Sequence, residues 1–174
     1  MVSSVIIPSW NPESASVFEV HEIKNMLEFI GVNGDTITFI IGCMAIYPSI
    51  YYIIAFIIGF IVNIQLNKIL KSVFKEPRPL NKSSNSVYEV GAEEKWGFPS
   101  GHAQLTSYAF IYLLLVNPKK QAFLILLCIF LCITVIQRYV FNKHTIPQLI
   151  AGLFIGSTFA FLYVWFITFI RPYI

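Results

Sequence analysis

The chain has 174 residues, of which 56% are hydrophobic and 12% are charged, and its net charge is +3. Soluble domains carry about 25% charged residues, so this composition, with a mean hydropathy of +0.69, excludes an ordinary soluble domain. The small net charge and the lack of a nucleic-acid-binding motif in the sequence give no reason to expect nucleic acid as a partner.

Charged residues are missing from four long stretches, namely residues 36–67, 103–118, 121–137 and 145–170. Uncharged apolar runs of about 20 residues are typical of transmembrane helices. A buried helix of a soluble protein would explain one such stretch but not four. We therefore expect an all-α, integral membrane helical bundle, with residues 36–174 as its membrane-embedded domain.

The N-terminal segment, residues 1–35, differs because it contains five acidic side chains and one lysine. Its apolar residues recur at helical spacing, as in Val17, Val20, Ile23, Met26, Leu27 and Ile30. This pattern predicts a separate amphipathic helix that lies on the membrane or packs on the bundle.

The first uncharged stretch, residues 36–67, is too long for one ordinary span. As a single helix it would extend roughly 48 Å, whereas the hydrocarbon core of a bilayer is about 30 Å thick. Pro48 offers a break near its middle. We expect two short spans, residues 37–45 and 50–70, and keep one long tilted helix as the alternative.

The other three stretches each predict one span, at residues 103–116, 122–136 and 149–170, which gives about five transmembrane helices in all. The last of these has a small residue at every fourth position, Gly152, Gly156 and Ala160. Small residues at this spacing favour close packing against another helix.

Three polar clusters separate these spans. The first contains Lys71 and Arg78, the second Ser100, Gly101 and His102, and the third Arg138 and His144. A polar loop without a span, residues 80–98, joins the first cluster to the second, and two spans join the second to the third. All three clusters are therefore expected on the same face of the membrane.

The residue types in these clusters suit phosphate chemistry. Arginine binds phosphate bidentately and lysine binds it as a point charge, although Lys71 and Arg78 alone would equally suit a basic juxtamembrane anchor. Ser100 and Gly101 precede a predicted helix start, where free backbone N–H groups favour an anion. A neutral imidazole can attack phosphorus while a second imidazole protonates the leaving oxygen. No carboxylate cluster suited to a metal ion accompanies these groups, so we expect no cofactor.

The order and spacing of these residues resemble the three-part signature of the type 2 phosphatidic acid phosphatase superfamily, which includes lipid phosphate phosphatases, polyprenyl diphosphate phosphatases and glucose-6-phosphatase. The resemblance covers residues 71–148. It implies that His144 is the nucleophile, which forms a phosphohistidine, and that His102 is the general acid. It also implies an active site on the lumenal, outer or periplasmic face, and phosphate binding by Lys71, Arg78, Ser100, Gly101 and Arg138.

Two positions depart from the family pattern. Gln137 stands where the family usually has serine, and Gln148 stands where it usually has the aspartate that orients the nucleophilic histidine. A glutamine carbonyl can accept the ring N–H, but it supports a charged imidazole less well than a carboxylate does. The change Gln148→Asp is therefore expected to be tolerated or to improve turnover.

Gln148 after His144-Thr145, together with Trp96-Gly97-Phe98, resembles the dolichyl diphosphatase branch. The expected reaction is hydrolysis of a polyprenyl diphosphate to the monophosphate. One alternative is a broader lipid phosphatase acting on phosphatidic acid or phosphatidylglycerol phosphate, and another is a non-catalytic lipid-binding membrane protein. Counting Lys and Arg would put the site in the cytosol, whereas the resemblance implies the lumenal (endoplasmic reticulum) or periplasmic face.

Overall fold

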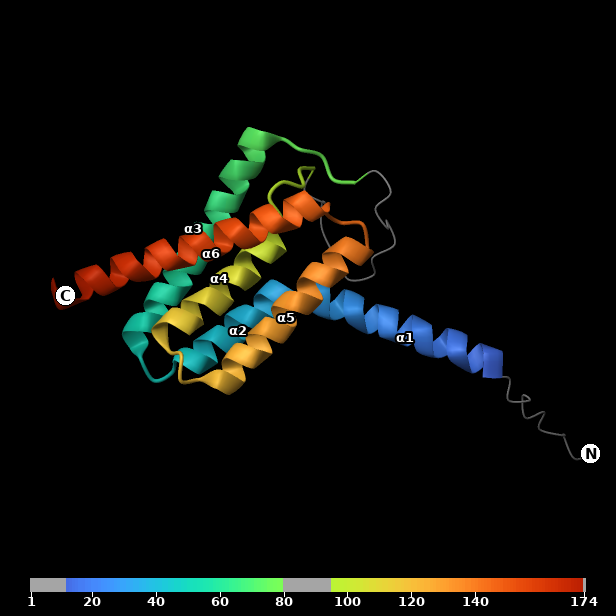
Figure 1. Cartoon of the computed structure of the whole chain (residues 1–174), viewed down its shortest axis with the longest axis horizontal. Helices are drawn as coiled ribbons and strands as arrows, with labels where there is room; N and C mark the ends of the chain where they lie inside the picture. Colours follow the sequence, from blue (N-terminus) through green and yellow to red (C-terminus); the bar gives the residue numbers. More distant parts are fainter. Residues whose placement is uncertain (1–11, 80–94, 174) are drawn as a thin grey trace, which may run out of the picture.

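A computed structural model describes residues 12–79 and 95–173, and it describes side chains from Glu22 onward. Residues 1–11 and most of the polar loop lie outside the described residues. The described chain forms six α-helices and one short 3-10 helix (Figure 1). These are α1 (Pro12–Val32), α2 (Gly34–Ile46), α3 (Ile50–Phe74), α4 (Gly101–Val116), α5 (Gln121–Val140), α6 (Ile146–Ile170) and η1 (Arg171–Tyr173).

The all-α membrane bundle is confirmed, but the number of spans is smaller than predicted. Among the described residues, α3, α5 and α6 are long and apolar enough to cross a membrane. A fourth span is possible if α1 and α2, which meet at a bend of 61°, count together as one broken span. The expectation of about five spans is therefore corrected to three or four.

Helix length explains this correction. With 16 residues α4 extends about 24 Å, and with 13 residues α2 extends about 20 Å, both short of a hydrocarbon core of about 30 Å. Helix α4 is instead the centre of the bundle, in contact with α2, α3, α5 and α6 (Figure 1). Its Tyr108, Ala109, Tyr112 and Leu113 are fully buried. Neighbouring helices, rather than lipid, surround most of α4.

The uncharged stretch 36–67 is divided as predicted. Helix α2 ends at Ile46 and α3 begins at Ile50, so the break falls at Pro48. Helix α3 ends where Lys75 adopts a left-handed conformation, with φ of 48°, and donates its N–H to the Lys71 carbonyl. A left-handed residue of this kind closes a helix, and it directs the chain into the first polar cluster.

Helix α1 departs from a simple amphipathic helix. Its Ile23, Met26 and Phe29 are at least half exposed, whereas Glu28 is buried. Gly31 lies directly against the side chain of Gln137 on α5, where no larger residue would fit. The C-terminal end of α1 is thus fixed to the bundle. An orientation along the membrane surface and a domain boundary at residue 35 remain predictions.

The small residues of α6 pack against α4 as predicted. A Cβ atom added at Gly152 would lie 2.5 Å from the carbonyl oxygen of Ser100. At Gly156 an added Cβ would collide with the carbonyl oxygen of Gln104. This close approach holds the first turns of α6 against the start of α4 and so brings the third polar cluster to the second.

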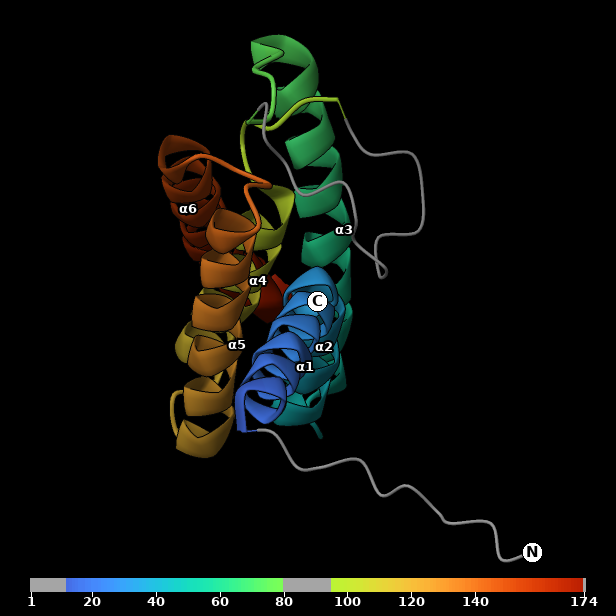
Figure 2. The same cartoon turned by 90° about the vertical axis from the view of Figure 1, so that its right-hand side faces the viewer.

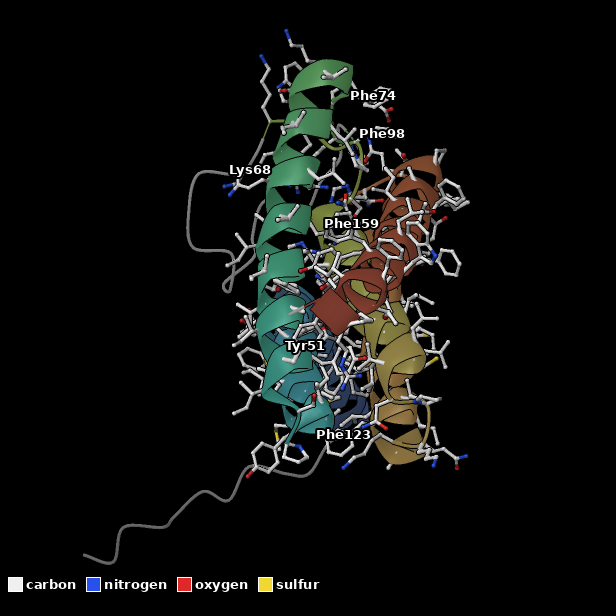
Figure 3. The ribbon with its side chains drawn as sticks, turned by 90° about the vertical axis from the view of Figure 1, so that its left-hand side faces the viewer. Tyr51, Lys68, Phe74, Phe98, Phe123 and Phe159 are labelled. Carbon is white, nitrogen blue, oxygen red and sulfur yellow. The ribbon has the colours of Figure 1, made fainter. Side chains whose placement is uncertain are left out.

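Aromatic side chains hold α3 against α4. The Tyr108 hydroxyl donates to the Phe56 carbonyl at 3.0 Å, and the two rings stack with centroids 5.5 Å apart. Figure 3 shows Phe74 and Phe98 together toward one end of the molecule and Phe123 at the other. The centroids of Phe74 and Phe98 are 4.8 Å apart. This contact attaches the approach to the second cluster to the end of α3.

Candidate active site

The three polar clusters lie toward one end of the bundle. Figures 1 and 2 show the end of α3, the start of α4 and the connection between α5 and α6 on the same side. A backbone bridge between Pro77 and Trp96 joins the first cluster to the segment that enters the second. The N–H of Ser100 donates to the carbonyl of Gln148 at 3.0 Å, which joins the second cluster to the third.

His102 occupies the first turn of α4, beside the bend between α1 and α2. Its Nε2 atom lies 2.5 Å from Nη2 of Arg138 and 3.1 Å from the Val32 carbonyl oxygen. The carboxylate of Asp35 lies 3.8 Å away. A neutral ring can accept from Arg138, while a protonated ring can donate to the Val32 carbonyl. Both protonation states of His102 therefore have a partner.

Asp35 was not predicted as a site residue. It lies in the first turn of α2, where its Oδ1 accepts a bond of 2.8 Å from the Thr36 N–H. The bend between α1 and α2 turns this carboxylate toward His102. The sequence feature that could have pointed to Asp35 is its position, because it is the last charged residue before the uncharged stretch 36–67.

A tight turn after α5 brings His144 close to Arg138. The N–H groups of Lys143 and His144 both donate to the Arg138 carbonyl, at 3.0 and 3.2 Å. Asn142 makes this turn possible with a left-handed φ of 52°, a conformation that asparagine tolerates better than most residues. Helix α6 then starts with Thr145 as its N-cap in a capping box with Gln148.

The imidazole of His144 is 3% exposed and fixed in one orientation. Its Nδ1 lies 3.1 Å from Oε1 of Gln148. Because a carbonyl oxygen can only accept, Nδ1 carries the proton and Nε2 carries the lone pair. Burial, followed by the positive charges of Arg78 and Arg138, lowers the pKa of His144 from 6.5 to about 3. The ring is therefore neutral near pH 7, as a nucleophile must be.

The start of α4 has the features of an anion site. Ser100 is fully buried, and its hydroxyl oxygen has no hydrogen-bond partner among the described residues. Gly101 begins the helix, whose first N–H groups have no partner within it. A Cβ atom at Gly101 would lie 3.1 Å from Oδ1 of Asn67, so glycine leaves the backbone accessible. A phosphate oxygen bound here would satisfy the Ser100 hydroxyl.

Lys71 is buried at the end of a polar row on α3. One turn before it, Asn67 donates to Oε1 of Gln104 at 2.8 Å and to the Pro99 carbonyl at 3.3 Å. Gln104 in turn donates to Oδ1 of Asn63 at 2.6 Å. Buried polar groups inside a membrane bundle require such partners. This row fixes the Lys71 end of α3 beside the second cluster.

A second carboxylate was also missed at the level of sequence. Oε1 of Glu76 accepts a bond of 2.7 Å from Nε2 of Gln148. Its sequence signal was that it is the only acidic residue in the first cluster, between Lys71 and Arg78. The contact spans 72 positions along the chain, so spacing alone gave no indication of it.

The described residues contain no group of three or more His, Cys, Asp or Glu side chains that could hold a metal ion. The three clusters contribute two imidazoles, three cationic side chains and the start of a helix, and Asp35 and Glu76 add two carboxylates beside them. A reaction that needs no metal remains a prediction.

The sequence profile of the PAP2 superfamily matches residues 39–172, which is most of the chain. The chain belongs to the PAP2 superfamily. It is therefore an integral membrane phosphatase, a phosphomonoester hydrolase that acts on lipid phosphates. Comparison of the sequence with curated proteins gives no match.

The fold of this PAP2 phosphatase is similar to a crystal structure described as the first transmembrane PAP2-type phosphatidylglycerolphosphate phosphatase from Bacillus subtilis. The TM-score is 0.63 and the sequences are 20% identical. The match covers 91% of this chain and 78% of the other. At this identity the similarity establishes the shared fold alone.

Proposed function

We propose that this PAP2 phosphatase hydrolyses a polyprenyl diphosphate to the monophosphate through a phosphohistidine at His144. The observation that carries the proposal is the protonation state and fixed orientation of the His144 ring. Its ring is buried and neutral, with Nδ1 held by Gln148 and with the charges of Arg78 and Arg138 acting on it. These features leave Nε2 free to attack a phosphorus atom that the arginines attract.

In the first step, Nε2 of His144 forms a bond to the terminal phosphorus and the bond from phosphorus to the bridging oxygen breaks. The lipid monophosphate leaves, and His102 gives its proton to the departing oxygen. Lys71, Arg78 and Arg138 neutralise the oxygens of the transferred phosphoryl group. The hydroxyl of Ser100 and the N–H groups that follow it bind the same oxygens.

In the second step, water attacks the phosphohistidine and His102 takes the proton from that water. The bond between phosphorus and Nε2 breaks, inorganic phosphate is released, and both imidazoles return to their starting states. The Val32 carbonyl and the Asp35 carboxylate, 3.1 and 3.8 Å from Nε2 of His102, stabilise its protonated form, which is present before the first step and is restored by the second.

The feature that supports a diphosphate substrate is the resemblance of Gln148 and the 96–98 segment to the dolichyl diphosphatase branch. The positive charges of Lys71, Arg78 and Arg138 suit a diphosphate and a phosphate monoester alike, because they belong to the signature of the whole superfamily. In this chain the segment contacts the first cluster, because the Gly97 N–H donates to the Glu76 carbonyl at 2.7 Å.

The second candidate substrate is phosphatidylglycerol phosphate or phosphatidic acid. The observation that favours it is the shared fold with the Bacillus subtilis phosphatase.

We place the site on the lumenal or periplasmic face, following the family. Intact vesicles of known orientation test this directly, because a substrate that cannot cross the membrane will be hydrolysed from one side only.

The test of the proposed function is phosphate release in detergent from matched amounts of a polyprenyl diphosphate, phosphatidic acid and phosphatidylglycerol phosphate. We expect the polyprenyl diphosphate to give the highest kcat/KM, with no loss of activity in EDTA. Faster turnover of either glycerophospholipid would reject the diphosphate assignment. Binding without turnover of any of the three would identify a lipid-binding protein, and His144→Ala is the inactive control.

A further inference from the structure

Gln148 is the direct partner of the proposed nucleophile and is itself fully buried. Its carbonyl oxygen Oε1 accepts two hydrogen bonds. One comes from Nδ1 of His144 at 3.1 Å and the other from the Thr145 N–H at 3.2 Å. Both lone pairs of the amide oxygen are therefore in use.

The amide nitrogen of Gln148 is equally occupied. Nε2 donates to Oε1 of Glu76 at 2.7 Å and to the Pro77 carbonyl at 3.0 Å. Rotating the amide by 180° would point its N–H groups at two donors and its oxygen at two acceptors. The four contacts thus allow only one orientation, with the carbonyl on His144 and the amide N–H on the carboxylate.

The chain around Glu76 is built to keep this contact. The Glu76 carbonyl accepts from the Gly97 N–H at 2.7 Å, and Pro77 is bridged to Trp96. A Cβ atom added at Gly97 would lie 2.6 Å from Oε1 of Gln148, so only glycine lets the 96–98 segment cross over this amide. The first and second clusters together enclose the Gln148 side chain.

We propose that Glu76 is a positioning residue, which supplies through Gln148 the negative charge that holds and supports the His144 ring. This inference rests on the proposed phosphohistidine mechanism. When His144 bonds to phosphorus, its ring becomes positively charged. A carboxylate that polarises the intervening amide strengthens the hydrogen bond that Nδ1–H of His144 donates to Oε1 of Gln148, since hydrogen bonds in a chain reinforce one another.

The arrangement also explains how a glutamine can stand at a position where the family usually has aspartate. A carboxylate is still present, but it belongs to Glu76 and acts on the His144 ring through Gln148 instead of contacting the ring directly. A carboxylate at position 148 would lie next to Glu76 and would repel it. The contacts therefore reverse the expectation from sequence, and we now expect Gln148→Asp to lower turnover.

Glu76→Gln tests the charge, because glutamine has the same shape and keeps an oxygen that can accept from Gln148. We expect kcat to fall about tenfold, the effect of roughly 1.4 kcal/mol on a barrier, with little change in KM. Formation of the phosphoenzyme in a single turnover should slow by the same factor. Glu22→Gln, which removes the same charge from an exposed position on α1, is the matched control and should keep wild-type kcat.

The exchange variant Glu76→Gln/Gln148→Glu separates charge from packing. It returns the carboxylate to direct contact with Nδ1 of His144 and leaves an amide at position 76 to donate to it. We expect it to recover most of the turnover lost in Glu76→Gln. A purely structural role for Glu76 would give no such recovery.

Two outcomes overturn the inference. Wild-type kcat in Glu76→Gln would show that the charge is not used. An exchange variant as inactive or as unstable as Glu76→Gln would show that Glu76 acts through its own packing. Both leave the proposed function intact as long as His144→Ala is inactive in the same assay, whereas an active His144→Ala variant rejects the mechanism itself.

Discussion

The two histidines of the site have opposite surroundings. His144 is 3% exposed, and its direct partner is an amide. The side chain of His102 is 28% exposed, with an arginine and a carboxylate both near its Nε2 atom. The difference matches the two proposed tasks: a nucleophile must remain neutral and oriented, whereas a general acid must gain and lose a proton. Variants of the two histidines should therefore differ in which substrates lose turnover.

The largest expected effect is that of His144→Ala. Without the nucleophile the phosphohistidine cannot form, so kcat/KM should fall by at least about 10³-fold for every lipid substrate. Phosphate release in detergent measures this, with thermal unfolding to establish that the variant is folded. Residual turnover within about tenfold of wild type would contradict the assignment of the nucleophile.

His102→Asn should lower turnover by about 10²- to 10⁴-fold, but selectively. Its loss removes the proton given to the leaving oxygen, so a phosphate monoester with an alkoxide leaving group, such as phosphatidic acid, should suffer most. An activated substrate such as p-nitrophenyl phosphate, whose leaving group needs no proton, should lose much less. Equal losses on both substrates would show that His102 is not the general acid.

Asp35→Asn should give a smaller effect of the same kind. An ion pair at about 4 Å near a protein surface is worth roughly 1–4 kcal/mol, so we expect kcat to fall about tenfold for phosphatidic acid, which has an alkoxide leaving group. The loss on p-nitrophenyl phosphate should again be smaller. If Asp35→Asn affected both substrates equally, the carboxylate would be serving the structure of the α1–α2 bend instead of His102.

The last prediction concerns stability rather than activity. The pKa of His144 is about 3 in the folded protein and 6.5 in its ordinary state. Below pH 6.5 the unfolded chain binds a proton that the folded chain does not, so stability falls as the pH falls. Between pH 6.5 and about 4.5 this loss is about 2 kcal/mol.

Thermal unfolding in detergent across this pH range measures that loss. His144→Gln lacks the titrating ring and should show a flatter dependence of Tm on pH than the wild type does. Parallel curves for the two proteins would mean that His144 titrates near its ordinary pKa in the folded state and is not held neutral by burial.

Residue order and spacing were enough to predict the parts of this site that lie within one cluster. His102 after Ser100-Gly101, and His144 six residues after Arg138, can be recognised in the sequence. Topology then predicted that the clusters share one face of the membrane, and in the structure they lie together.

The remaining contacts depend on tertiary structure. The approach of Asp35 to His102 needs the 61° bend between α1 and α2, and the Asn33-Gly34 pair at this bend marks a turn without specifying its angle. The contact between Glu76 and Gln148 needs glycine at position 97 to let one segment cross over another. Helix α4 was counted as a span because its sequence is apolar, but an apolar sequence cannot distinguish a helix surrounded by lipid from one surrounded by protein.

The most direct test of the account is the identity of the phosphorylated residue. Wild-type protein would be mixed with a polyprenyl diphosphate labelled at its terminal phosphate, quenched within one turnover and digested under alkaline conditions. The account predicts an acid-labile phosphoryl group on His144 that is absent from His144→Ala. A phosphoryl group on His102, or full turnover with no labelled protein at any time, would contradict it.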